Sequence, residues 1–132
     1  MPPNVLIVED EMLLALELEA ILGDLGHVPV GIAPDQETAQ LYFDQHIDLA
    51  LVDLNLRDGR TGPEIGAKLG ANGVTVLFIT ANPAQLGNGI AGTVGVLAKP
   101  TDAATVKAAI DYALGIREGR DVPAPSALSL FG

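Results

Sequence analysis

The sequence predicts an α/β fold in which helices cover both faces of a parallel β-sheet. Short runs rich in Val, Leu and Ile alternate along the chain with segments whose apolar residues recur at helical spacing. The runs are apolar throughout, which is typical of parallel strands buried on both faces. Five alternations of strand and helix indicate a doubly wound sheet with right-handed crossovers.

The elements follow one another in a regular order. The first strand, at residues 5–8, leads into a helix over 11–25 that Gly26 ends. Pro29 within the second strand, at 28–33, predicts a position at the edge of the sheet. The later elements are expected to be a helix over 34–46, a strand over 48–53, a helix over 62–72, strands over 74–79 and 94–98, and a helix over 102–116.

The segment over 81–93 is unusual for the helix that should connect the fourth and fifth strands. It contains Pro83, Gly87, Gly89 and Gly92. Since glycine costs about 1 kcal/mol relative to alanine within a helix, this helix is expected to be short or frayed. Counting it, the chain has five strands and five helices. A flavodoxin-like strand order, 2-1-3-4-5, would place the first and third strands together at the switch point where ligands bind.

The organisation expected is one domain over residues 1–117 and a flexible, proline-containing tail over 118–132. The chain has 132 residues, enough for one core, and the core should be aliphatic because only 4% of residues are aromatic. A net charge of −10 disfavours nucleic acid as a partner. No run is long enough to cross a bilayer and there is no cysteine for a disulfide, so a cytoplasmic protein is expected.

Polar residues that can bind ligands or react lie at the ends of four of the five strands. Glu9 and Asp10 follow the first strand, Asp53 ends the third, Thr80 follows the fourth and Lys99 follows the fifth. The carboxyl ends of parallel strands open on one edge of the sheet. We therefore expect these five side chains to converge from distant positions in the sequence.

Three carboxylates in one cleft repel one another unless one is protonated or a cation binds. Oxygen ligands of this kind suit Mg²⁺. Glu9 and Asp10 alone could instead favour the positive end of the following helix, but Asp53 at a neighbouring strand end argues for a cation site. A carboxylate such as Asp53 can also take a phosphoryl group, whose oxygens Lys99 and Thr80 could then contact.

This set of residues resembles the receiver domain of bacterial response regulators of the chemotaxis-regulator type, over residues 4 to about 115. The resemblance implies a single-domain response regulator of a two-component system, which accepts a phosphoryl group on Asp53 from a sensor histidine kinase. It implies that Lys99 and Thr80 contact that group and that the peptide before Pro100 is often cis. Such a protein is a signalling switch rather than an enzyme, since it catalyses only its own phosphorylation and dephosphorylation.

The resemblance also implies a set of metal ligands. Mg²⁺ would be bound by Asp10, Asp53 and the backbone carbonyl of Asn55, with Glu9 acting through a water molecule. Output would come through the face of the fourth helix, fifth strand and fifth helix, which would contact a downstream protein or a second copy. The protein could instead act as a phosphate sink for its kinase.

Some positions depart from the receiver pattern. Val96 stands where many receivers have an aromatic residue that rotates on phosphorylation, and Arg57 stands where proline is common. The phenylalanine at position 78 resembles one found in a subgroup of alphaproteobacterial receivers that lack the switch aromatic. Ala81 and Asn82 differ from the residues that usually follow in that subgroup. We therefore hypothesise that residues 82–93 switch between order and disorder.

Two other classes of function are compatible with some of these residues. An Mg²⁺-dependent aspartyl-phosphate phosphohydrolase of the haloacid-dehalogenase type shares Asp, Thr and Lys, but its nucleophile lies on the first strand. A scaffold with an unused site is disfavoured because all the acidic residues, Thr80 and Lys99 are present. The G-x-G-x-x-G pattern over 87–92 neither directly follows a strand nor opens a helix, so it does not indicate a dinucleotide site.

Overall fold

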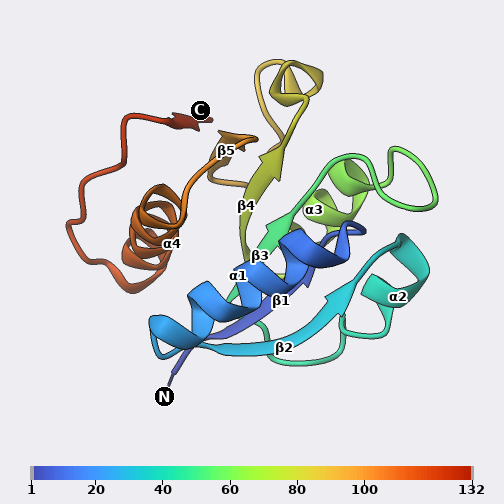
Figure 1. Ribbon diagram of the computed structural model, residues 1–132, viewed down its shortest axis with the longest axis horizontal. Helices are drawn as coiled ribbons and strands as arrows, with labels where there is room; N and C mark the ends of the chain where they lie inside the picture. The colour runs from blue at the N-terminus through green and yellow to red at the C-terminus, as the bar shows by residue number, and fades with distance from the viewer. Residues whose placement is uncertain (1, 132) are drawn as a thin grey trace.

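A computed structural model describes residues 2–131 of the chain, and Met1 and Gly132, the last residue of the expected tail, lie outside the described range. The described residues form one six-stranded sheet. The strand order is β2-β1-β3-β4-β5-β6 (Figure 1). The strands are β1 (Asn4–Val8), β2 (Val28–Ala33), β3 (Leu49–Val52), β4 (Thr75–Thr80), β5 (Gly95–Ala98) and β6 (Leu128–Leu130). The helices are α1 (Met12–Asp24), α2 (Gln36–Gln40), α3 (Gly62–Ala71), the short 3-10 helix η1 (Pro83–Leu86) and α4 (Ala103–Glu118).

The α/β flavodoxin-like fold is confirmed, with β1 to β5 parallel and in the expected order. The expectation of five strands and five helices is wrong in detail, because the described residues form six strands and four α-helices. No α-helix forms between β4 and β5, since Gly87, Gly89 and Gly92 all adopt positive φ. The helix expected over 34–46 is also shorter, and turns replace its second half.

Alternating residues of the strands face two separate apolar layers. Val5 and Ile7 of β1 pack with residues of α1 and α4, while Leu6 and Val8 pack with residues of α2 and α3. This period of two is the ordinary geometry of a strand, and covering both faces leaves the strand ends as the accessible part of the sheet. Figure 1 shows α1 in front of the sheet and α3 behind it.

The start of α4 is fixed close to the carboxyl end of β5. Asp102 caps the helix by accepting a hydrogen bond from the Thr105 amide at 2.7 Å, and Gly119 ends it in the left-handed conformation at φ 73°. Only four residues separate β5 from this helix. Lys99, the first of them, is therefore held at the edge of the sheet.

The chain continues beyond α4 and returns to the sheet. Leu128–Leu130 pairs antiparallel with β5 as β6, and it lies beside β5 in Figure 1. The division into a domain over 1–117 and a flexible tail over 118–132 stays a prediction, although part of that tail is a strand here. Among the described residues, no helix has the length and apolar character to cross a membrane.

Candidate functional site

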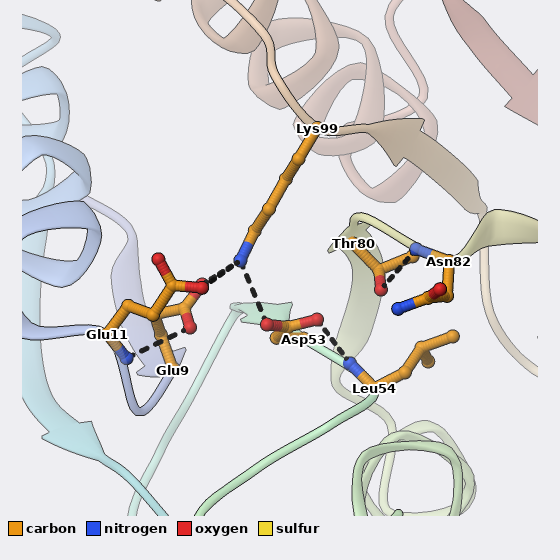
Figure 2. A network of polar contacts seen from close by, with 7 residues as sticks. All are labelled: Glu9, Glu11, Asp53, Leu54, Thr80, Asn82 and Lys99. Atoms are coloured by element: carbon orange, nitrogen blue, oxygen red, sulfur yellow. Dashed lines mark hydrogen bonds and ion pairs between the residues drawn. The ribbon is translucent and has the colours of Figure 1, made fainter.

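Polar side chains from four strand ends meet at the carboxyl edge of the sheet. Val8 and Val52 occupy equivalent register positions on β1 and β3, so Glu9 and Asp53, which follow them, emerge together. Thr80 pairs with Ala98 at the ends of β4 and β5, which brings Thr80 close to Lys99. Figure 2 shows Asp53 between Glu9 on one side and Thr80 on the other, with Lys99 reaching down from the end of β5. The convergence expected from the sequence is therefore present.

The Lys99 ammonium group joins the two buried carboxylates of this site. Its Nζ lies 2.8 Å from Glu9 Oε1 and 2.9 Å from Asp53 Oδ2. Only 13% of the lysine side chain is exposed. Burial by itself lowers the pKa of Lys99, but its hydrogen bonds to Glu9 and Asp53 outweigh burial and raise that pKa above its ordinary value. The side chain is therefore a permanent positive charge beside Asp53.

Glu9 is almost fully buried, with 2% of its surface exposed. Its Oε2 accepts a hydrogen bond from the Glu11 amide at 3.2 Å. Burial raises the pKa of Glu9 to about 7, and the neighbouring charge of Asp53 acts in the same direction, while the hydrogen bonds from Lys99 and Glu11 oppose them. At neutral pH this carboxyl group therefore exists in both charged and protonated forms.

Asp53 is 7% exposed and is oriented by two donors. The Leu54 amide donates to Oδ1 at 2.7 Å, while Lys99 donates to Oδ2 at 2.9 Å (Figure 2). Together with Glu9 and the exposed Asp10, Asp53 offers carboxylate oxygens that lie within 4.8 Å of one another. Three carboxylates against one ammonium leave an excess of negative charge, and this all-oxygen set fits a hard dication.

Thr80 is fully buried at the end of β4. Its Oγ accepts a hydrogen bond from the Asn82 amide at 3.1 Å, so the start of the segment between β4 and β5 is attached to the site through this hydroxyl. Asn55 lies half-buried on the loop after Asp53. The peptide bond between Lys99 and Pro100 is cis.

The sequence did not point to three further contacts around the site. Glu11 Oε1 lies 3.9 Å from Lys99 Nζ, and the run of acidic residues at 9–11 was the available signal. The Arg57 guanidinium pairs with Asp35, and Asp58 accepts from the Gln36 amide at 3.0 Å. These last two contacts join the loop after β3 to the start of α2, and no local pattern reveals them because the partners are 22 residues apart.

The position of the missing switch aromatic is part of a buried apolar cluster. Val96 is buried with Phe78 in the layer beneath α2 and α3. Phe131, from the end of the chain, packs against the same cluster, and its ring centroid lies 6.3 Å from that of Phe78. An aromatic side chain therefore reaches this region from the tail instead of from β5.

Residues 5–111 match the family described as response regulator receiver domain. The chain belongs to this family. The receiver is 36% identical over 118 residues to the Phyllosphere-induced regulator PhyR of Methylorubrum extorquens, in an alignment that covers 86% of this chain and 44% of that protein. It is 42% identical over 82 residues to the two-component response regulator PhoP of Pseudomonas aeruginosa, covering 59% of this chain and 35% of that protein.

Solved structures of similar proteins share the receiver's fold. The receiver domain of PhyR from Erythrobacter litoralis aligns with a TM-score of 0.77 and 33% identity, over 94% of this chain and 96% of that one. PhyR from Brucella abortus aligns with a TM-score of 0.79 and 33% identity, over 90% of this chain and 50% of that one. The receiver spans less than half the length of the two curated relatives.

Membership in this family places the receiver in two-component signalling. Receiver domains are signalling switches that histidine kinases phosphorylate, and they generally bind Mg²⁺ at an acidic pocket. The cluster of Glu9, Asp10 and Asp53 forms such a pocket.

Proposed function

We propose that this receiver acts in the cytoplasm as a response regulator, which accepts a phosphoryl group on Asp53 from the phosphohistidine of a sensor histidine kinase. The observation that carries the proposal is the Lys99 ammonium, 2.9 Å from Asp53 Oδ2 in a pocket that also contains the Thr80 hydroxyl. A carboxylate held beside a positive charge and a hydroxyl donor is suited to receive a group that carries negatively charged oxygens.

Transfer needs one new bond and the loss of another. An oxygen of Asp53 forms the O–P bond while the P–N bond of the donor breaks, and the imidazole leaves with that electron pair and takes up a proton. The Leu54 amide, 2.7 Å from Oδ1, orients the carboxylate for this attack. The phosphoryl oxygens are then stabilised by Lys99 and Thr80.

Asp10, Asp53 and the backbone carbonyl of Asn55 would hold Mg²⁺, with Glu9 acting through a water molecule. The support for this is the cluster of carboxylate oxygens within 4.8 Å and its negative charge, which Lys99 only partly offsets. A bound dication supplies positive charge that stabilises the transferring phosphoryl group.

The start of α1 lies three residues after Glu9 in the chain. Met12, Leu13 and Leu16 are exposed apolar residues on this helix. A groove of about 710 Å³ between α1 and the start of α4 opens beside Glu9 and Lys99. We propose that the kinase docks on this surface, because exposed apolar residues next to a reactive group favour a protein partner over a small molecule.

The output is proposed to involve residues 82–93, β5 and α4, which correspond to the face expected from the sequence. This face would contact a downstream protein or a second copy; draining phosphate from the kinase is the alternative. Asn82 donates to the Thr80 hydroxyl, so engagement of that hydroxyl by a phosphoryl group would release the start of the segment. We expect amide exchange over 82–93 to change when beryllofluoride mimics the phosphoryl group, and unchanged protection would contradict an order–disorder switch.

The decisive experiment measures the transfer of radiolabelled phosphate from a phosphorylated histidine kinase in the presence of Mg²⁺. Label should appear on the wild-type chain and be absent from Asp53→Asn, which keeps the size of the side chain but removes the nucleophile. Asp44→Asn, at an exposed aspartate, is the matched control and should accept label normally. Transfer to Asp53→Asn would sink the proposal, and turnover of unrelated phosphate esters would favour the phosphohydrolase.

A further inference from the structure

Strand β6 covers the edge of the sheet that β5 would otherwise expose. Leu128–Leu130 pairs antiparallel with β5, and the Phe131 amide extends the pairing by donating to the Val94 carbonyl at 3.0 Å. An uncovered edge strand presents unpaired amide and carbonyl groups and is a ready template for another strand. The chain's own end satisfies these groups, so the β5 edge has the properties of a strand-binding site that is already filled.

Two side chains hold the tail, one on each face of the sheet. Leu128 is buried in the layer that contains α1 and α4. Phe131 packs on the opposite layer, where its ring meets Phe78 and lies directly against Gly89. The segment therefore has an aliphatic and an aromatic side chain, three residues apart, that pack in the two apolar layers on either side of β5.

Gly95 allows the close approach of the two strands. A Cβ added at this residue would collide with the carbonyl oxygen of Ser129, and its nearest neighbours all belong to the tail. The pairing of Gly95 with Leu130 places this contact at the C-terminal end of β6. Gly95→Ala should thus displace β6 from β5 while leaving the pairing of β5 with β4 intact.

The linker that brings the tail back is short and ends in a turn, which the Leu128 amide closes by donating to the Pro125 carbonyl at 3.0 Å. Val122 lies against Gly115 on α4. Ala127 lines a hollow together with Thr105, which lies ten residues before Gly115 on the same helix. Ten residues of helix span about 15 Å. The five residue steps from Val122 to Ala127 can span at most about 18 Å. The length of the linker therefore limits whether the tail reaches the edge of its own sheet.

We propose that the β5 edge is a strand-docking surface that residues 128–131 close within the chain, and that its partner, when the tail cannot fold back, is the same segment of a second copy. Residues 122–131 carry no charge, so they can approach a second copy despite its net charge of −10. Ile116 of α4 and Leu130 of β6 are exposed at 52% and 51% and line one hollow, which the partner would cover. Exchange of an identical element between two copies is a low-cost route to a dimer.

The test shortens the linker in the full chain. Deleting residues 123–126 leaves four residue steps from Gly119 to Ala127, about 14 Å, whereas the helix from Thr105 to Gly119 spans about 21 Å. The tail then cannot reach its own β5, and light scattering should give the mass of two chains. Replacing residues 123–126 by Gly-Ser-Gly-Ser keeps the length and should leave a monomer. Gly95→Ala in the deletion variant should restore the monomer.

Two results would overturn the proposal: a monomeric deletion variant with an unprotected Phe131 amide, or a dimer that survives Gly95→Ala. Amide exchange over β1 and β3 confirms that each variant is folded. A second measurement uses the full chain with Leu128→Asp, which should release its own tail, together with a synthetic peptide of residues 126–131. The peptide should shift the β5 amide resonances of this variant and leave them unshifted when Gly95→Ala is added; no shift in either would also refute the proposal. The proposal does not depend on phosphorylation of Asp53.

Discussion

The two halves of the proposed phosphorylation site differ in what holds them in place. Glu9 follows β1, a strand that is paired on both sides and covered by the 13 residues of α1. Thr80, on the other half, leads into a segment whose only regular structure is the four-residue helix η1. Phe131, from a distant part of the chain, packs against this segment. The comparison indicates that the half with the acidic cluster depends on the core, whereas the half expected to respond depends on the tail.

Lys99→Ala should have the largest effect on stability, because it acts on the charge balance of the site. Removing the ammonium leaves Glu9 and Asp53 buried without their common partner, which should lower the free energy of unfolding by about 3 kcal/mol in metal-free buffer at pH 8. Urea unfolding measures the loss. Lys68→Ala, which removes an exposed lysine paired with Glu64, should cost less than about 0.5 kcal/mol. Equal losses in the two variants would contradict the buried charge pairing.

Phe131→Ala should separate the two halves of the site most clearly. It removes a partly buried ring and its contact with Phe78, so the expected loss is about 1–2 kcal/mol. Amide exchange should speed up over residues 82–93 and stay unchanged in α1. Leu130→Ser, at the exposed neighbouring residue that ends β6, is the control and should change neither region. A uniform increase in exchange across the domain would remove the distinction between the halves.

Glu9→Gln should change the pH dependence of stability more than stability itself. The pKa of Glu9 rises from 4.5 to about 7 on folding, so the folded state binds more protons than the unfolded state between these values. Stability contributed by this group is therefore present below pH 4.5 and is lost as pH rises toward 7, by at most about 1.4 kcal/mol per pH unit. The variant should lack this component when unfolding is measured in EDTA. A wild-type profile identical to that of Glu9→Gln would refute the assignment.

The polar edge could be predicted from sequence because each of its residues is tied to a strand end. Apolar runs set the ends of the strands, and parallel strands bring Glu9, Asp53, Thr80 and Lys99 to one edge whatever the details of packing. The glycines after Thr80 also signalled that no full helix would form there. The sequence indicated that the fourth expected helix, over 81–93, would be weak, but it did not show how far the weakness extends.

The sixth strand could not be predicted because its cause is not local. Leu128–Leu130 is too short to signal a strand, and it follows a proline-containing segment that is typical of a flexible tail. Its pairing depends on Gly95, on the seat beside Phe78 and on a linker that matches the length of α4. Each of these features is common by itself, and the strand forms only because the folded chain brings them together.

Sequence alone thus determined the fold class and which polar side chains meet at the edge of the sheet, since strand ends and charged residues are local features that a parallel sheet brings together. The tertiary structure decided how Lys99 divides its contacts between two carboxylates, how far burial raises the pKa of Glu9, and which strand closes the β5 edge. The physical reason is that burial, charge pairing and edge pairing depend on distances between residues far apart in the chain.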